Sequence, residues 1–401
     1  MTRIRDRAAV ALALGIATAT FWGTFWGTSS GTSPAADSVG TDDRASAYQW
    51  QLPRGFPTPA VPADNPMSEA KAALGRRLFF DTRLSVTGQY SCASCHDPNR
   101  SFSDGRAVAV GATGASLPHS AMPLINVAYN VSFGWSDPKL TSLEAQMLQP
   151  LLNEHPVELG LRGREDQVAA ALAQDESYPA AFAAAFASNP QASGSPQASG
   201  APGPAATATA VTFDHIVKAI ATFERTLVFG DSPFDRYVFG GEHAALSPEA
   251  KRGMGLFFST RAGCSSCHSG FNFSGNWRDS QGETGNASFA RNGTTDQPMR
   301  VPTLRNIAMT APYMHDGRFT TLDAVLDHYA RVAERARNSR DNSGLMPARA
   351  PEGGSDTDPR LRTFDLSAPE RADLIAFLQS LTSKSLTSPT SRPSGVRTAG
   401  R

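Results

Sequence analysis

The chain has 401 residues, and its 37 Lys and Arg residues balance 37 Asp and Glu residues, so its formal net charge is zero. This balance argues against nucleic acid or an anionic membrane surface as the main partner, because either would favour a basic excess. Hydrophobic residues make up 40% of the chain and charged residues 18%, which is typical of a globular protein with a core. Since one core rarely grows beyond about 250–300 residues, the length favours two domains.

The N-terminus has the layout of a secretory leader. Three arginines within residues 3–7 precede an apolar stretch from about residue 8 to residue 27, and small residues follow around positions 34–36. We therefore predict that residues 1–36 are a signal peptide and that the protein is exported. The alternative is an uncleaved membrane anchor, because about 20 apolar residues can span a bilayer.

Two segments of low complexity interrupt the mature chain. Residues 188–210 are rich in Ala, Ser, Gly and Pro and repeat the sequence QASG, and residues 384–401 have a similar composition. Neither segment has enough apolar residues to bury a core, so we predict a flexible insertion and a disordered tail.

An internal duplication organises the remaining sequence. A helix-forming segment that starts at Ser68 continues through LFF at 78–80 to CASCH at 92–96, and a second one from Ser247 continues through LFF at 256–258 to CSSCH at 264–268. Both serines are candidate N-caps. Two copies of one unit predict two similar domains, at 46–229 and 230–383.

Other segments read as helices joined by long loops. Apolar stripes occur at 212–227 and at 367–381, and the second stripe opens on a capping box at 367–370. No convincing run of alternating apolar and polar residues indicates strands. The fold is therefore predicted to be mostly α.

All four cysteines lie in two CxxCH motifs, which are the attachment signature of c-type haem. Two thiols three residues apart can add to the two vinyl groups of one porphyrin, and the adjacent histidine then ligates the iron. The motif residues are Cys92, Cys95, His96, Cys264, Cys267 and His268. A thioredoxin-like redox pair does not need the histidine, and a Cys₄ zinc site would need both pairs to converge. The two complete copies and the leader favour two covalent haems, each in its own cytochrome c-like domain.

The occupant of the sixth iron position decides the function of a haem. Six histidines remain outside the motifs, and each is more often a core or surface residue than an iron ligand. The helix-forming segment that begins at Leu322 has apolar residues at spacings of three, four and seven, and the last of them is Tyr329. Spacing alone therefore predicts that Tyr329 is a core tyrosine with a satisfied hydroxyl group. His328 lies away from this face and is expected to face water.

Five longer motifs are specific enough to indicate a family. They are LGRRLFFDTRLS before the first CxxCH, PVELG around residue 158, FERTL at 223–227, VPTLRN, and APYMHDGRFTTLDAV. With these motifs, residues from about 64 to 382 resemble the bacterial dihaem cytochrome c peroxidase and MauG superfamily. The segments DNPMSEAK, HSAMPLINVAYN and HPVELGLRGRE are most similar to its MbnH-type branch, whose members act on a partner protein. The resemblance and the leader together imply a haem peroxidase of the periplasm.

The resemblance implies roles around the first haem, in the domain 46–229. His96 is the implied proximal ligand of the peroxide-reacting haem. Glu158 and Gln146 match distal-pocket residues, where a carboxyl group can carry a proton between the two peroxide oxygens. The alternative for Glu158 is a solvated loop carboxylate. Trp135 lies near the position of a tryptophan between the two haems, where an indole can relay electrons, and its alternative is ordinary core packing.

Around the second haem, in the domain 230–383, the resemblance implies an unusual ligand set. His268 is the implied proximal ligand. Peroxidases that take electrons from small carriers place a methionine seven residues after the leucine that corresponds to Leu322, and in this chain that position is Tyr329. The resemblance therefore implies a tyrosine ligand of the MauG type, with Met309 and Met314 as fallback ligands.

A tyrosine ligand has a chemical consequence. A soft thioether favours ferrous iron, whereas a hard phenolate favours ferric and higher states. The resemblance then implies an enzyme that uses hydrogen peroxide to form a high-valent dihaem state and oxidises a Trp or Tyr side chain of a secreted partner protein. The first alternative is a cytochrome c peroxidase that reduces peroxide to water with electrons from a small cytochrome c or cupredoxin. The second is a dihaem electron carrier without catalytic activity.

A calcium ion is left open by the sequence. Calcium-binding relatives hold the ion between their domains with an Asn side chain and two backbone carbonyl groups. Thr310 and Pro312 match the carbonyl positions, but Ser120 stands where the Asn would be.

Three further residues are matched by the resemblance. The loop that supplies a closing histidine to the peroxide-reacting haem in some peroxidases has only the displaced His119, so we expect a site that needs no reductive activation. Arg305 and His315 match residues that support the haem environment without a catalytic role.

Overall fold

The computed structural model describes residues 48–187, 210–285, 288–341, 358–361 and 364–383. The predicted signal peptide 1–36, nearly all of the predicted insertion 188–210 and the predicted tail 384–401 lie outside the described residues. Within the described part of the chain, none of the helices is both long and apolar enough to cross a membrane.

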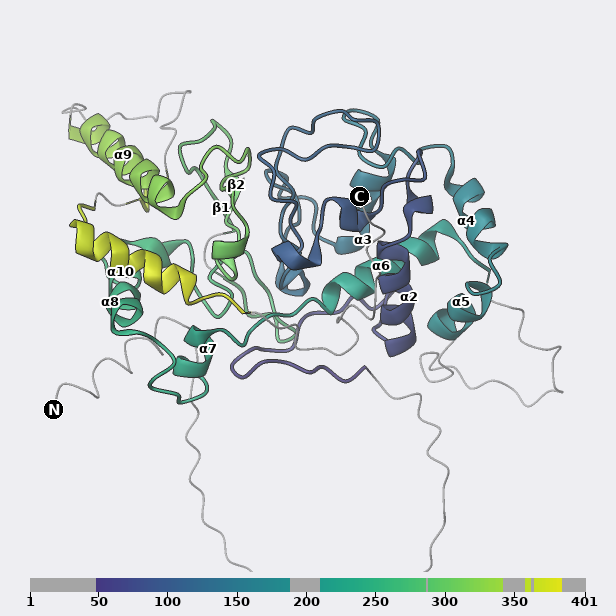
Figure 1. The fold of residues 1–401 in the computed structure, drawn as a ribbon, viewed down its shortest axis with the longest axis horizontal. Helices are drawn as coiled ribbons and strands as arrows, with labels where there is room; N and C mark the ends of the chain where they lie inside the picture. The colour runs from purple at the N-terminus through teal and green to yellow at the C-terminus, as the bar shows by residue number, and fades with distance from the viewer. Residues whose placement is uncertain (1–47, 188–209, 286–287, 342–357, 362–363, 384–401) are drawn as a thin grey trace, which may run out of the picture.

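The described chain is mostly helical, as predicted, and its two halves lie side by side (Figure 1). The helices of the first half are α2 (Glu69–Phe79), α3 (Leu143–Leu152), α4 (Glu165–Ala173), α5 (Pro179–Phe186) and α6 (Phe213–Arg225). Those of the second half are α7 (Pro233–Val238), α8 (Pro248–Phe257), α9 (Leu322–Asp341) and α10 (Ala368–Gln379). Two short strands, β1 (Phe289–Ala290) and β2 (Met299–Arg300), pair antiparallel in the second half. Single 3₁₀ turns are η1 (Thr82–Leu84), η2 (Cys92–Ser94), η3 (Pro98–Arg100), η4 (Val127–Tyr129), η5 (Cys264–Ser266) and η6 (Ile307–Met309).

Each half has its own apolar core. In the first half α2 packs against α6, and the ring centroids of Phe79 and Phe223 are 5.2 Å apart. In the second half α8 packs against α10, and the ring centroids of Phe257 and Phe377 are also 5.2 Å apart. All four rings are fully buried. In each half, this aromatic contact therefore holds the helix that precedes the CxxCH motif against its partner helix.

A glycine lets the helices of each pair approach closely. A Cβ atom at Gly75 would lie 1.8 Å from the carbonyl oxygen of Ala219, and a Cβ atom at Gly253 would lie 1.9 Å from the carbonyl oxygen of Asp373. Both separations are far below van der Waals contact, so any larger residue would force the helices apart. In both halves the glycine is on the helix that precedes the CxxCH motif.

The predicted helix starts are confirmed. The hydroxyl groups of Ser68 and Ser247 each accept a hydrogen bond of 3.1 Å from the backbone N–H three residues later. Ser367 and Glu370 form the predicted capping box at the start of α10. These caps satisfy N–H groups at helix starts and set where α2, α8 and α10 begin.

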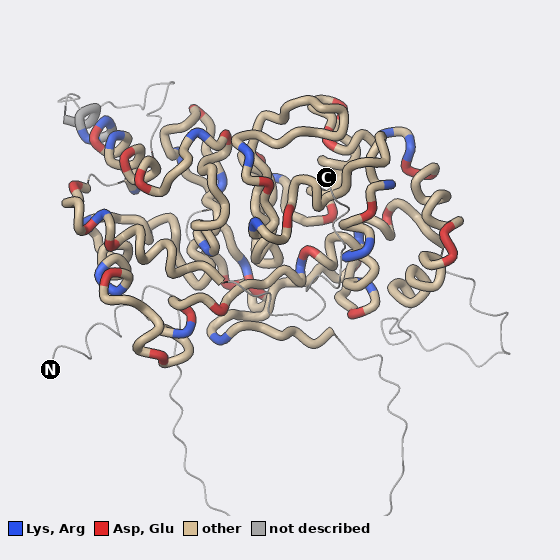
Figure 2. Tube along the Cα trace, viewed as in Figure 1, with Lys and Arg blue, Asp and Glu red and all other residues tan. Residues whose placement is uncertain are grey.

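Charged residues of both signs are mixed over both halves, and this view shows no large region of one sign (Figure 2). Many of them form ion pairs between elements, such as Arg252 with Asp373 at 2.7 Å between α8 and α10. The distribution agrees with the zero formal net charge of the sequence.

Candidate active site

Each CxxCH motif forms one compact turn. The first three residues of the motifs form the 3₁₀ turns η2 and η5. The backbone N–H of the motif histidine then donates to the carbonyl oxygen of the first cysteine, at 2.9 Å for His96 and 3.0 Å for His268. The two thiols and the imidazole of a motif therefore project from a single turn of backbone.

The orientation of each motif histidine is fixed by its second ring nitrogen. Nδ1 lies 2.9 Å from the carbonyl oxygen of Phe102 in His96, and 3.2 Å from that of Phe273 in His268. A carbonyl oxygen only accepts, so Nδ1 carries the proton and the Nε2 lone pair is left for a metal. This backbone support is the arrangement that metal-ligating histidines use.

The motifs fit covalent haem better than the alternative cysteine chemistries. All four cysteines are free thiols, and burial raises the pKa of Cys264 to about 12 and that of Cys95 to about 11, so the thiols are not activated nucleophiles. No group of three or more His, Cys, Asp and Glu residues within the described chain could hold a metal ion by itself. The two pairs therefore do not converge into the Cys₄ zinc site that the sequence left open.

An apolar cavity adjoins the second motif. The motif residues Cys264, Cys267 and His268 line it, and Tyr329 of α9 lines it as well. Side chains of α8, α9 and α10 complete the apolar lining: Phe257, Leu322, Val325, Leu326, Leu374 and Leu378. The donor set of one imidazole and one phenol on the walls of an apolar cavity fits a haem iron with two axial ligands.

Among the described residues, Tyr329 does not have the satisfied hydroxyl group that its spacing predicts. Its side chain is half-buried, and the hydroxyl group has no hydrogen-bond partner within the described residues. Burial, and after it the neighbouring Cys267 and Cys264, raise the pKa of Tyr329, so the phenol is neutral until a metal displaces its proton. Of the two fallback ligands, Met314 lines the same cavity, whereas the sulfur of Met309 accepts a hydrogen bond from Ser101.

The prediction that His328 faces water is wrong. Only 7% of the residue is exposed, Nε2 lies 2.8 Å from the carbonyl oxygen of Asn292, and the ring lies 5.1 Å from that of Phe319. These two partners lie on different loops, Asn292 between β1 and β2 and Phe319 just before α9, and together they cover a second side of α9. The spacing of apolar residues identifies the most apolar face of a helix, but it cannot show that loops cover another face of the same helix.

At the first motif, Glu158 is a half-buried carboxyl group on the loop between α3 and α4. Burial raises the pKa of Glu158, which distinguishes it from the solvated loop carboxylate of the alternative interpretation. The backbone N–H of Ala112 donates to the carbonyl oxygen of Glu158 at 2.7 Å, and Sγ of Cys95 lies 3.9 Å from the carbonyl oxygen of Val110. The loop of Glu158 therefore adjoins the segment that contacts the first motif, and the charge of Glu158, after burial and Asp104, also raises the pKa of Cys95. Gln146 lies half-buried on α3, and no hydrogen bond joins it to Glu158 among the described residues.

Trp135 reaches the second cavity from the first half of the chain. It lines the cavity, its indole N–H donates to the carbonyl oxygen of Ser120 at 3.1 Å, and its ring centroid lies 6.3 Å from His119 and 6.4 Å from His315. Burial lowers the pKa of both histidines, so both are neutral at neutral pH. The structure thus brings the predicted residues Trp135, His119 and His315 together, with Trp135 and His315 on the cavity wall and the ring of His119 packed against both.

The residues of the possible calcium site also come together. Ser120, Thr310 and Pro312 all line the same cavity. The hydroxyl group of Ser120 donates to the carbonyl oxygen of Met314 at 3.2 Å, and its backbone N–H donates to that of His315 at 2.7 Å.

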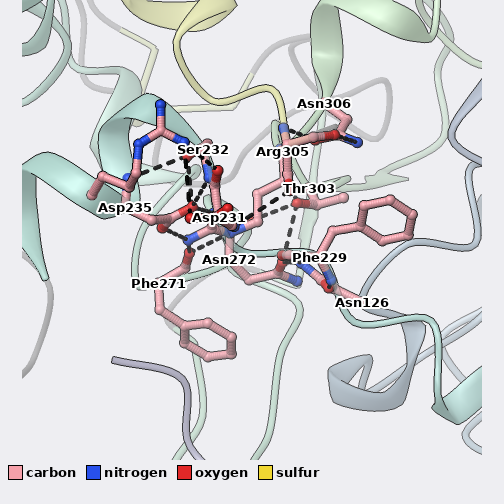
Figure 3. A network of polar contacts seen from close by, with 12 residues as sticks. Asn126, Phe229, Asp231, Ser232, Asp235, Phe271, Asn272, Thr303, Arg305 and Asn306 are labelled. Carbon is pink, nitrogen blue, oxygen red and sulfur yellow. Dashed lines mark hydrogen bonds and ion pairs between the residues drawn. The ribbon is translucent and has the colours of Figure 1, made fainter. Parts of the chain in front are cut away.

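Arg305 supports the second motif from outside the cavity. Its guanidinium forms a two-point ion pair with Asp235 at 2.9 and 3.0 Å, and its Nε donates to the carbonyl oxygen of Phe271 at 2.8 Å (Figure 3). The next residue, Asn272, accepts a hydrogen bond of 3.0 Å from Asn126 of the first half. Arg305 therefore fixes the backbone just after His268 to α7, next to the contact between the halves.

Sequence reasoning assigned no role to two buried charged residues near the motifs. Glu224, in the FERTL motif on α6, is 4% exposed, and burial raises its pKa to about 8. Its charge, after burial, raises the pKa of Cys92. Arg300 of β2 is 6% exposed and lines the second cavity. The signal that could have marked them is a charged residue inside or beside a family motif: Glu224 lies within FERTL, and Arg300 directly precedes VPTLRN.

Two haem-attachment turns, each with a backbone-supported histidine, define a dihaem c-type protein. Comparison with known proteins then identifies the family: residues 69–243 match the family model described as di-haem cytochrome c peroxidase. The methylamine utilization protein MauG of Methylorubrum extorquens is 35% identical over 353 residues, covering 86% of this chain and 87% of the relative. The cytochrome c551 peroxidase of Pseudomonas aeruginosa is 30% identical over 306 residues, covering 73% and 80%.

A solved structure supports the same assignment. The crystal structure of a MauG-like protein associated with microbial copper homeostasis has 33% sequence identity and a TM-score of 0.72, covering 86% of this chain and 99% of that chain. The chain therefore belongs to the dihaem cytochrome c peroxidase and MauG superfamily, and it is a haem peroxidase with two c-type haems. The predicted likeness to the MbnH-type branch is consistent with this structural neighbour.

Proposed function

We propose that this chain is a periplasmic enzyme that uses hydrogen peroxide to form a high-valent dihaem state and to oxidise a Trp or Tyr side chain of a partner protein. The observation that carries the proposal is the presence of Tyr329 on the wall of the second haem cavity, with no hydrogen-bond partner among the described residues. The similarity to MauG proteins and to a MauG-like structure supports it.

The phenol explains why the second haem would favour oxidation. When bound, the two haems supply the redox chemistry that reduces peroxide and stores its oxidising equivalents. A phenolate is a hard, anionic ligand, so Tyr329 would stabilise ferric and higher states of a haem iron that it and His268 would hold. A neutral thioether would stabilise the ferrous state and favour acceptance of electrons from a carrier.

The first site supplies proton transfer. Glu158 is proposed to act beside the haem that His96 would hold, which the contact of its loop with the segment next to Cys95 supports. In the proposed step, its carboxylate takes the proton from one peroxide oxygen and returns it to the departing oxygen. Gln146 is proposed to line the same distal pocket, and Trp135 is proposed to relay electrons between the two haems.

The proposal predicts the behaviour of Tyr329→Phe. The variant should retain both covalent haems, because the cysteines and motif histidines are untouched, but it should lose the high-valent state and the oxidation of the partner. Stopped-flow and electron paramagnetic resonance spectra after addition of stoichiometric peroxide to the ferric protein would measure the loss.

Tyr313→Phe is the matched control. Tyr313 is 9% exposed and lines the same cavity, but it does not lie on α9. This control should keep the peroxide reaction of the unaltered protein. Normal peroxide-driven oxidation of a partner by Tyr329→Phe, or equal losses in both variants, would contradict the ligand role of Tyr329.

A second candidate function is the cytochrome c peroxidase reaction, in which a small cytochrome c or cupredoxin supplies electrons. The presence of Met314 in the second cavity and the similarity to the cytochrome c551 peroxidase of Pseudomonas aeruginosa favour this candidate. Rapid peroxide-dependent oxidation of a reduced carrier, with no modification of any partner protein, would establish it over the first proposal.

We also propose that the chain divides into a peroxidatic domain at 46–229 and an electron-transfer domain at 230–383, related by internal duplication. The separate cores and the glycine-mediated helix pair in each half support this division. A calcium ion at Ser120, Thr310 and Pro312 stays a prediction, which metal analysis of the purified protein before and after chelation would test.

A further inference from the structure

The second cavity contains a buried arginine to which the proposed chemistry gives no role. Arg300 lies on β2, lines the cavity and is 6% exposed. Its backbone N–H donates to the carbonyl oxygen of Trp135 at 2.7 Å, so the residue is fixed where the two halves meet. Within the described residues, its guanidinium has only the sulfur of Met122 as an acceptor, at 2.7 Å. A thioether sulfur is a weak acceptor and carries no charge.

Two other buried arginines show what this guanidinium lacks. Arg305 forms a two-point ion pair with Asp235, and Arg225 pairs with Glu144 at 2.8 Å. Arg300 has no carboxylate partner in the described part of the chain, and its Nε–H has no acceptor there. Burial lowers the pKa of Arg300 to about 10, so the group is still a cation at neutral pH. A buried cation is costly unless an anion accompanies it.

The missing anion can come from what the cavity binds. A haem attached at Cys264 and Cys267 brings two propionate carboxylates with its apolar ring. We propose that Arg300 is the carboxylate-binding residue of this cavity and that its guanidinium pairs with a propionate of the C-terminal haem. Planar guanidinium groups suit this role because they can donate two parallel hydrogen bonds to one carboxylate.

The pair sets the charge beside the second haem and Trp135. A carboxylate that a neighbouring cation keeps ionised does not take up a proton when the iron is reduced. The midpoint potential of the C-terminal haem is therefore expected to stay constant between about pH 5 and pH 8 in the unaltered protein. Without the cation, the propionate titrates in this range, and the ionised form favours ferric iron.

Arg300→Met tests this proposal, because it removes the charge and keeps an unbranched side chain. In this variant, we expect the midpoint potential of the C-terminal haem to fall as the pH rises from about 5 to about 8. At the upper end of this range it should lie about 59 mV or more below that of the unaltered protein, which is a tenfold change in the ferric-to-ferrous ratio. The potential of the N-terminal haem should not change. Spectroelectrochemical titration gives both potentials, and mass spectrometry verifies haem attachment.

Arg106→Met is the matched control. Arg106 lines the same cavity but is exposed, so water screens its charge and both potentials should be unaffected. An Arg300→Met protein with both haems attached and with the potential and pH independence of the unaltered protein would overturn the proposal.

Arg300→Lys keeps the test decisive if Arg300→Met does not fold. Lysine preserves the charge but not the two-point geometry, so the propionate bending band of the C-terminal haem in the resonance Raman spectrum should shift. An unchanged band would overturn the proposal as well. These measurements use neither peroxide nor a partner protein, so their outcome is separate from that of the proposed function.

Discussion

At the level of single residues, the proposed proton-transfer role of Glu158 can be tested through the environment of its carboxyl group. Its loop adjoins the segment that contacts Cys95, and burial raises the pKa of the carboxyl group above the ordinary value for a glutamate. A base that must accept a proton from peroxide acts only when it is ionised. The raised pKa therefore brings the loss of the active form closer to the pH range in which the enzyme would work.

This environment predicts the pH dependence of the peroxide reaction. The rate should fall as the pH decreases through the pKa of Glu158, and the midpoint of that fall should lie above about 4.3, the value for an unperturbed glutamate. Glu158→Gln should slow the reaction by about 10²–10⁴-fold and remove this acidic limb, because the amide cannot accept the proton. Stopped-flow mixing of the ferric protein with peroxide across the pH range measures both effects.

Glu154→Gln provides the comparison for this variant. Glu154 lies on the same loop, but it is exposed and pairs with Arg162 at 3.2 Å. Its substitution should leave the rate and its pH profile unchanged. If Glu158→Gln also reacts at the unaltered rate, Glu158 has no part in the mechanism.

At the level of secondary structure, the contact between α8 and α10 depends on one glycine. Gly253→Ala should destabilise the protein by about 1–3 kcal/mol or more, because the new Cβ atom would lie 1.9 Å from a backbone oxygen that cannot rotate away. Gly255→Ala on the same helix has nothing within 4 Å and should stabilise it by about 0.5–1 kcal/mol through helix propensity. Urea unfolding of both variants measures the two effects. Equal stability changes at the two positions would show that close packing of α8 against α10 does not limit stability.

The same scale shows what the sequence could and could not predict. Local rules predicted the caps at Ser68 and Ser247, because a cap needs only a side chain and the N–H group three residues later. They failed for His328, because two loops bury it, one with Asn292 and one with Phe319, and the paths of these loops depend on tertiary contacts. Arg300 escaped notice for a related reason: its position on the wall of a cavity depends on the pairing of β1 with β2.

At the level of the whole molecule, the second cavity is built by both halves of the chain. The CxxCH motif and Tyr329 come from the second half, whereas Trp135 and Ser120 come from the first. The sequence could suggest that Trp135 lies between the haems only through the family resemblance, because no periodicity connects residues so far apart. The contact between Asn126 and Asn272 is a second connection across the halves (Figure 3).

The position of Trp135 predicts how oxidising equivalents pass between the haems. After peroxide reacts at the N-terminal haem, the C-terminal haem is expected to lose an electron to it. Trp135→Phe should slow this electron transfer by at least about tenfold, because phenylalanine is much harder to oxidise than an indole. A tenfold change corresponds to about 1.4 kcal/mol of activation free energy. Rapid-freeze spectroscopy that distinguishes the two irons would follow this electron.

Trp277→Phe separates a relay from a packing role. Trp277 is also half-buried, packs 5.2 Å from Phe271 and lies outside the residues that line the cavity. Loss of an indole at this position should leave the transfer rate unchanged, even if it lowers stability. A Trp135→Phe protein that transfers the electron as fast as Trp277→Phe would mean that Trp135 only packs between the halves. The two haems would then communicate directly through space or through another group near Trp135, such as the neutral imidazoles of His119 and His315.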